Sequence, residues 1–308
     1  MKFHYSVQFL IILASNLIFA QGPPINTNTA FVMGLEGGAI RSYLKIVSKS
    51  TLLKNGNKIT DEMDRKVNVF AFPIMVPYEV IPNKLVVIGA IPYIKKEMNL
   101  TQNGQRIMRS NAGLGDFKLL AKYQFFQRDS RNSTLRMTGL GGIEFPTGKD
   151  NKSDSIGLLP APLQLGSGSI DFIGGTIVTY VKNRIGFNTE VIYKKNTKAI
   201  DYQFGDVLTL NIALGYRIFP KVYNIYPSPY STVYIELLSQ FSGKDKMKNT
   251  MQKNTGGNIL MVSPGLQHVF SRTFLLEASL QYPVSQKLNG IQLGDDYTFN
   301  FGFRLLIN

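Results

Sequence analysis

The sequence predicts an all-β protein, a transmembrane antiparallel up-and-down β-barrel of about twelve strands (roughly 10–14) preceded by a signal peptide. Three observations carry this prediction: an export signal at the start, alternation of apolar and polar residues along many segments, and connections that are alternately long and short. A soluble β-sandwich would also alternate, but nothing in it requires the loops at one end to be consistently longer. The pattern therefore favours a barrel over a sandwich.

The export signal occupies residues 1–20. Lys2 provides its positive charge, an apolar run follows, and the small Ala20 precedes a segment rich in Gly and Pro. This order is typical of a cleaved secretory signal peptide, and the run is short for an uncleaved membrane anchor. We expect export to the outer membrane of a Gram-negative bacterium. Residues 21–37 are then a short periplasmic or luminal segment, and residues 38–308 are the barrel.

Alternation identifies the strands. Along 296–307 one side of the chain carries Phe299, Phe301, Phe303 and Leu305, and the other carries mostly polar or small residues. Side chains alternate between the faces of a strand, so one face is apolar and the other is not. We predict twelve strands, each near or above the roughly 9–11 residues that cross a bilayer. They are 38–50, 66–76, 85–97, 116–127, 134–145, 170–181, 185–195, 205–218, 231–243, 258–269, 274–285 and 296–307.

The connections give the orientation. Long polar stretches at 51–65, 98–115, 146–169, 196–204, 244–257 and 286–295 alternate with short links at 128–133, 182–184 and 270–273, while 77–84 and 219–230 are longer exceptions. Bacterial barrels have short periplasmic turns and long outer loops, so both termini are expected in the periplasm. The alternating aromatic residues of the last strand predict recognition by the barrel-assembly machinery, although the chain ends in Ile307-Asn308 and not in Phe.

Composition limits the function classes. The net charge is +14 and cysteine is absent, which excludes disulfides and a lipid-modified cysteine. Export makes nucleic acid an unsuitable partner for the positive charge, so we expect anionic lipopolysaccharide or an anionic solute instead. The remaining expected partners are outer-membrane lipid and a small-molecule solute. We predict no cofactor.

Catalytic and metal sites are not expected. The chain has two histidines: His4 leaves with the signal peptide, and His268 shares the lipid-facing side of its strand near a periplasmic turn. Asp61, Glu62 and Asp64 share one loop, where weak calcium binding is conceivable, but solvated acids are far more common there. We therefore predict no enzyme activity, no catalytic residue and no metal site.

The polar faces of the strands predict a charged lumen. Two interpretations are open: a network of ion pairs that fills the lumen, because unpaired buried charge is costly, or a pore lining whose basic excess favours anions. A barrel of about twelve strands lies between a filled small barrel and an open porin. The predicted lumen-facing residues are Arg41, Lys45, Lys118, Lys122, Arg136, Glu144, Glu190, Arg217, Glu236, Glu277 and Arg304.

Several short segments resemble the family described as the MetA-pathway of phenol degradation. They are Gly142-Ile-Glu-Phe-Pro-Thr-Gly-Lys-Asp150, Leu165-Gly-Ser-Gly-Ser169, Leu214-Gly-Tyr-Arg217, Pro264-Gly-Leu-Gln267 and Gln281-Tyr-Pro-Val284. The resemblance implies an outer-membrane barrel that moves hydrophobic or aromatic compounds.

Two functions follow as hypotheses. The first is a channel or transporter for small hydrophobic or aromatic solutes, with residues 21–37 available as a plug. The second is a non-transporting surface or structural barrel that acts through its extracellular loops. In that case the basic residues of one loop would contact lipopolysaccharide phosphates, namely Lys244, Lys246, Lys248 and Lys253.

Overall fold

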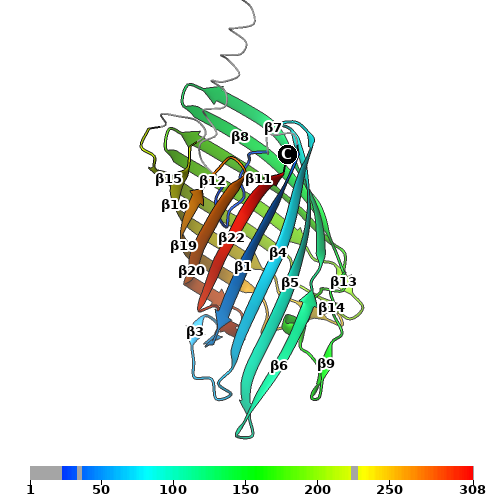
Figure 1. The fold of residues 1–308 in the computed structure, drawn as a ribbon. Helices are drawn as coiled ribbons and strands as arrows, with labels where there is room; N and C mark the ends of the chain where they lie inside the picture. Colours follow the sequence, from blue (N-terminus) through cyan, green and yellow to red (C-terminus); the bar gives the residue numbers. More distant parts are fainter. Residues whose placement is uncertain (1–22, 33–36, 223–227, 308) are drawn as a thin grey trace, which may run out of the picture.

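The computed structural model describes residues 23–32, 37–222 and 228–307, and it is a closed antiparallel β-barrel of twelve strands (Figure 1). The predicted fold class and strand number are confirmed. The predicted signal peptide, 1–20, lies outside the described residues. Around the barrel the strands are β1 (Gly38–Lys49), β4 (Lys66–Ile81), β5 (Leu85–Gln102), β7 (Phe117–Ser130), β8 (Ser133–Phe145), β11 (Asp171–Lys182), β12 (Ile185–Lys195), β15 (Val207–Phe219), β16 (Tyr230–Ser242), β19 (Gly257–Val269), β20 (Phe274–Leu288) and β22 (Tyr297–Ile307).

The first and last barrel strands close the cylinder. β1 pairs antiparallel with β22 over eleven residue pairs, from Gly38 opposite Ile307 to Ser48 opposite Tyr297. Every other strand pairs antiparallel with its neighbours in chain order. Closure provides hydrogen-bond partners for the backbone without leaving an edge, which a sheet in hydrocarbon requires.

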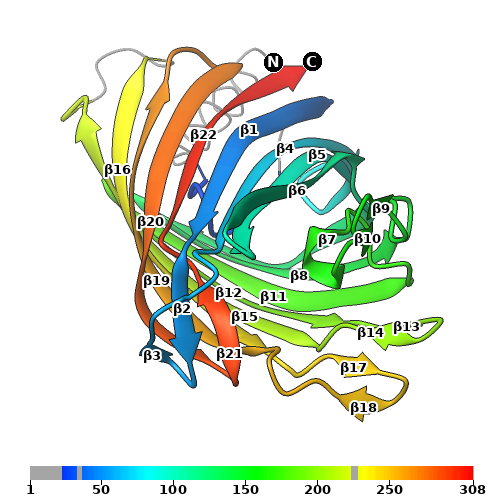
Figure 2. The same cartoon turned by 90° about the horizontal axis from the view of Figure 1, so that it is seen from below.

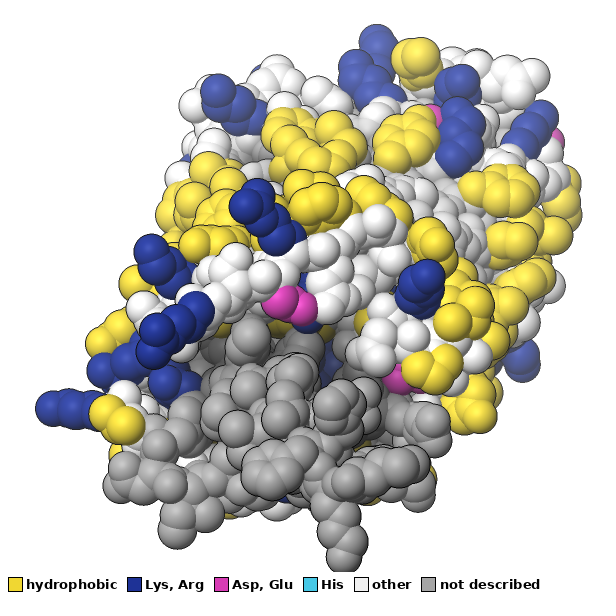
Figure 3. All heavy atoms as spheres, turned by 90° about the horizontal axis from the view of Figure 1, so that it is seen from above, with side chains coloured by type: hydrophobic (Ala, Val, Ile, Leu, Met, Phe, Trp, Pro, Cys, Tyr) yellow, Lys and Arg dark blue, Asp and Glu magenta, His cyan; other side chains and the backbone are white. Residues whose placement is uncertain are grey.

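The outer face of the barrel is apolar. On β4 the exposed residues Phe72, Ile74, Val76 and Tyr78 alternate with less exposed ones, and β15 and β16 show the same alternation. Figure 3 looks onto the end of the barrel that carries the C terminus, and hydrophobic side chains spread over its outer flanks. Exposed apolar surface of this extent is unfavourable in water and suits lipid.

The structure corrects two strand boundaries. The strand predicted at 66–76 continues as β4 to Ile81 and pairs Pro77 with Ile88, although proline cannot donate to the ladder. A proline removes one donor only, and the exposed apolar alternation continues through Tyr78 and Val80. The link 77–84 is therefore a short turn, like the others at that end.

The second correction concerns 98–115, which was predicted to be a long loop. β5 runs on to Gln102, turns at Asn103-Gly104 and returns as β6 (Gln105–Leu114), a hairpin that extends past the barrel rim (Figure 1). β6 and β7 are successive partners of β5, separated by residues 115–116. The polar character of this segment concealed it, because a hairpin beyond the membrane has no need of an apolar face.

The other long connections form small sheets at the same end, seen in Figure 2. β2 (Thr51–Lys54) pairs with β3 (Asn57–Lys58) and β21 (Ile291–Gly294), and β14 (Tyr202–Gln203) pairs with β13 (Lys198–Ala199) and β17 (Lys246–Met247), which also pairs with β18 (Thr250–Met251). The 146–169 connection holds β9 (Ser153–Asp154), β10 (Gly157–Leu158) and a 3-10 turn, η2 (Ala161–Leu163). Among the described residues no helix is long and apolar enough to cross a membrane.

Candidate functional site

A segment that precedes the barrel lies inside it. Residues 23–32, here called the luminal segment, form hydrogen bonds with inward side chains of β1, β7, β8, β11, β12, β16, β19, β20 and β22. Apart from the bond between Arg41 and Ile25, which are 16 residues apart, these bonds link positions 93 to 280 residues apart along the chain. The segment therefore crosses the lumen and is held there by the wall.

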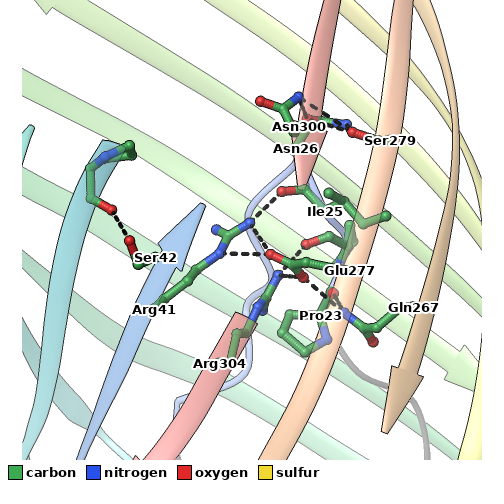
Figure 4. A network of polar contacts seen from close by, with 12 residues as sticks. Pro23, Ile25, Asn26, Arg41, Ser42, Gln267, Glu277, Ser279, Asn300 and Arg304 are labelled. Carbon is green, nitrogen blue, oxygen red and sulfur yellow. Dashed lines mark hydrogen bonds and ion pairs between the residues drawn. The ribbon is translucent and has the colours of Figure 1, made fainter. Parts of the chain in front are cut away.

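Its first part rests on a buried charge cluster, shown in Figure 4. Glu277 is 2% exposed and pairs with Arg41 at 2.9 Å and Arg304 at 2.8 Å. Each arginine also donates to the luminal segment: Arg304 to the carbonyl of Pro24 at 2.7 Å, and Arg41 to the carbonyl of Ile25. The positive charges of Arg41 and Arg304 are thus balanced by one carboxylate and by two backbone carbonyl groups of the luminal segment.

The centre of the luminal segment is gripped by two carboxylates. Glu236, fully buried on β16, accepts hydrogen bonds from the backbone N–H groups of Asn26 at 3.0 Å and Thr27 at 2.7 Å. Glu190, on β12, accepts from the Asn28 side chain at 2.7 Å. A carboxylate that replaces water with several N–H donors is stabilised in a buried position, so these contacts fix the chain across the barrel.

The last part of the luminal segment meets the opposite wall through its carbonyl groups. Lys122 donates to the carbonyl of Thr29 at 2.6 Å, and Thr138 donates to that of Ala30 at 2.6 Å. Thr179 accepts from the N–H of Ala30 at 2.8 Å. Acidic wall groups thus meet N–H groups and a basic wall group meets carbonyls, which matches the polarity of the wall to that of the chain.

The remaining predicted lumen residues form local pairs. Glu144 binds Lys118 and Lys194, each at 2.8 Å, and Lys194 also lies 3.1 Å from Asp171. Arg136 binds Asp129 at 3.0 Å. The structure places Arg217 in a buried position near the end of β15.

Several contacting residues were absent from the predicted set. Lys194 shares strand parity with Glu190, so alternation alone was sufficient to find it. Asn26 was not identifiable, because its role depends on its side chain meeting Gln281 at 2.8 Å and Asn300 at 3.1 Å. No periodic pattern marks a loop-like segment that folds back into a lumen.

An open space remains in the outer half of the lumen. A cavity of about 530 Å³, here called the outer chamber, has Ile25 and Asn26 as its floor and extends to Lys49 and Asp295 near the loop end of the barrel. Residues of β4, β5 and β15 line it, together with residues of β1, β16, β19, β20 and β22. Lys45, predicted to face the lumen, lines it.

His268 lies outside this arrangement. Its ring Nδ1 is 2.8 Å from the Ser231 hydroxyl and its ring packs edge-on against Phe270, on the outward side of β19 near the end that carries the termini. Within the part of the chain that the structure describes, no group of three or more metal-ligating side chains is present.

Comparisons with known proteins place the chain. The family model described as MetA-pathway of phenol degradation matches residues 47–301. An outer membrane channel from Pseudomonas putida F1 has a TM-score of 0.69 at 13% identity, covering 93% of this chain and 100% of that one. The β domain of the Bordetella autotransporter BrkA (TM-score 0.44, 10% identity, 87% and 99% covered) and the translocator domain of the autotransporter NalP from Neisseria meningitidis (0.44, 10%, 98% and 95%) score lower. At these identities the likeness concerns the fold. No match to a curated protein was found.

Proposed function

Because the chain belongs to the MetA-pathway of phenol degradation family, we propose that it is an outer-membrane channel for small hydrophobic or aromatic solutes. The observation that carries the proposal is the outer chamber, a cavity of about 530 Å³ that extends to the loop end of the lumen and has the luminal segment as its floor. This volume falls within the roughly 300–1,000 Å³ of small-ligand sites.

The surface chemistry supports the membrane location. An apolar outer face and a closed hydrogen-bond ladder satisfy the two requirements of hydrocarbon. A signal peptide cut after Ala20 would make Gln21 the new N terminus, two residues before Pro23, where the luminal segment starts. The cleaved leader and the luminal segment are therefore compatible in one mature chain.

In this proposal the luminal segment is a plug that moves before a solute passes. Most of its contacts with the wall are hydrogen bonds, although Ala30 also packs in a small apolar cluster with Leu140 and Ile177, and water that enters the lumen replaces the hydrogen bonds one by one. Net hydrogen bonds are worth about 0.5–1.5 kcal/mol each, and those to charged groups about 1.5–3 kcal/mol. A segment held by such contacts is displaceable without unfolding the barrel wall.

Reconstitution tests the channel. Lipid vesicles containing the full mature chain are expected to take up phenol or benzyl alcohol faster than vesicles containing heat-denatured protein. Planar-bilayer recordings are expected to show discrete conductance events. Vesicles that show neither would contradict the proposal, provided that heat-modifiability on a detergent gel shows a folded barrel.

We propose no enzymatic activity. The ring of His268 lies on the outward face, where it contacts Ser231 and Phe270. Substituting His268→Ala is expected to leave solute uptake and barrel folding unchanged, and purified protein is expected to hydrolyse neither phospholipid nor peptide substrates.

The basic outer loop gives a second proposed contact. Lys244, Lys248 and Lys253 are exposed around the β17–β18 hairpin, whose turn at Lys248-Asn249 projects from the barrel. We propose that these lysines, with the half-buried Lys246, contact lipopolysaccharide phosphates. Replacing the four lysines with glutamine is expected to weaken binding to lipopolysaccharide while leaving solute uptake unchanged. Equal binding by both proteins would contradict this contact.

A further inference from the structure

We infer that the outer chamber is a binding site for amphipathic monoanions, specifically small aromatic carboxylates, in preference to neutral aromatic compounds. This inference rests on the proposed channel function and names the substrate class of the same lumen. It follows from the charge balance of the chamber and from the register of three of its strands.

The charge balance is positive. Four cations line the chamber, Arg41, Lys45, Lys49 and Lys96, against two carboxylates, Glu277 and Asp295, which gives a net charge of +2. Lys49 pairs with Asp295 at 2.8 Å, and Glu277 is shared with Arg304 from outside the lining.

Two lysines remain available to a ligand. Among the described residues, neither Lys45 nor Lys96 has a carboxylate within ion-pair distance. Lys96 donates to the carbonyls of Pro162 at 2.9 Å and Gln164 at 2.6 Å. An ammonium group has three donors, so those two bonds orient Lys96 and leave one N–H for another acceptor.

The strand register places an apolar patch between these two lysines. Val47 on β1 lies opposite Val69 on β4, which lies opposite Lys96 on β5. One step towards the centre, Lys45 lies opposite Ala71, which lies opposite Ile94. Strands are about 4.8 Å apart, so the backbones of Lys45 and Lys96 flank the patch diagonally, about 12 Å from each other.

A second wall completes the apolar surface. Leu238 on β16 and Ile259 and Met261 on β19 also line the chamber. A flat ring that rests against the Val47, Val69, Ala71 and Ile94 patch is therefore inside a cavity that has further apolar side chains in its lining. Its charged substituent then reaches the ammonium of Lys45 or Lys96.

The combination selects a ligand class. A simple inorganic anion finds cations but leaves the apolar patch exposed to water. A neutral ring covers the patch but leaves the two ammonium groups without a counter-charge in a confined space. An aromatic carboxylate satisfies both, since charge-assisted hydrogen bonds are about twice as strong as neutral ones.

Calorimetry on the detergent-solubilised mature protein tests the inference with three probes: sodium benzoate, benzyl alcohol and sodium acetate. We expect benzoate to bind about tenfold more tightly than either comparison compound, because benzyl alcohol lacks the charge and acetate lacks the ring. Lys45→Gln and Lys96→Gln are each expected to weaken benzoate binding about tenfold and to leave benzyl alcohol binding unchanged. Lys45→Arg is expected to retain benzoate binding.

The matched control is Lys66→Gln, which removes a charge from an exposed position on β4 that does not line the chamber. Each variant is first checked for folding by heat-modifiability. Equal affinity for acetate and benzoate would reduce the chamber to a simple anion site and overturn the inference. Equal affinity for benzyl alcohol and benzoate, insensitive to Lys45→Gln, would also overturn it.

The vesicle uptake assay separates this inference from the proposed function. If neutral aromatic compounds enter vesicles but benzoate has no binding preference, the channel stands and the substrate class is wrong. If benzoate binds selectively but no solute crosses, the site stands and the channel is wrong.

Discussion

The two halves of the lumen solve the problem of enclosed charge in different ways. In the inner half, Glu236, Glu277 and Lys122 are matched by N–H groups, arginines and carbonyls, most of them involving the luminal segment. In the outer half, Lys45 and Lys96 face a cavity without carboxylate partners among the described residues. The inner half is thus filled by matched polar contacts, whereas the outer half contains a cavity lined by two lysines without carboxylate partners among the described residues.

If the inner half is closed by the luminal segment, removing that segment should have the largest effect. A variant without residues 23–32, with the leader retained, is expected to show a several-fold higher single-channel conductance, because the charged wall groups are then solvated in an open lumen. A control variant lacks 244–253, an equal length of outer loop. Equal conductance in the segment-deleted and intact proteins would show that the constriction lies elsewhere.

The Glu277 cluster tests whether the inner half also supports the wall. Glu277→Gln leaves Arg41 and Arg304 without their shared carboxylate, and breaking a buried ion pair costs about 3–5 kcal/mol. Urea unfolding in detergent is expected to show a lower free energy of unfolding for this variant. The loss is expected near the lower end of that range, because the arginines are partly exposed.

Glu97→Gln is the matched control for that measurement. Glu97 pairs with Lys95 at 2.7 Å, but the Lys95 side chain is 51% exposed. Exposed ion pairs contribute about 0–1 kcal/mol, so little change is expected. Similar losses of unfolding free energy in both variants would contradict a larger role for the buried Glu277 cluster than for an exposed ion pair.

Reversing one charge in the outer half sharpens the comparison from the other side. Lys45→Glu lowers the chamber's net charge from +2 to 0. We expect the anion-over-cation permeability ratio to fall by several-fold in bi-ionic planar-bilayer recordings, with little change in unfolding by urea because Lys45 has no ion-pair partner to lose. A changed unfolding midpoint with unchanged selectivity would contradict both expectations.

The smallest expected effect lies in the loop at 59–65, beyond the outer half. Partial burial of Asp61 acts to raise the pKa of its carboxyl, but hydrogen bonds from Arg65 and Met63 and the charge of Arg65 outweigh burial and hold the pKa below its ordinary 3.8. Because the pKa of Asp61 is lower in the folded loop, its ionised carboxylate stabilises the loop at any pH above 3.8. This stabilisation is lost as the pH falls through the lowered pKa.

Backbone amide shifts of Met63 and Arg65, followed by NMR during acidification, report this titration. The midpoint is expected below 3.8, and Asp61→Asn is expected to abolish the transition. A midpoint at or above 3.8 would mean that these hydrogen bonds do not favour the charged carboxylate.

Sequence patterns predicted the wall better than its contents. All twelve barrel strands were located, most of them by alternation, because lipid outside and polar groups inside impose a period of two on a strand. The strands at 66–76, 85–97 and 170–181 showed this alternation only weakly. The predicted 66–76 strand stopped short of Ile81, although the exposed apolar alternation continues past Pro77, and β6 was missed because it lies outside the region that lipid constrains.

The sequence by itself determined the class of the molecule: a barrel with an apolar outer face, a basic lumen and long loops at one end. These properties depend on residue type and spacing along one strand. Only the tertiary structure decided which charges are matched. The partners of Glu277 come from two different strands, β1 and β22. The partners of Glu236 come from the luminal segment, more than 200 residues away from it in the sequence. The same holds for the outer chamber, because its lysines acquire their apolar neighbours from strand register. Register is the alignment of one strand against the next, and periodicity within a single strand does not specify it.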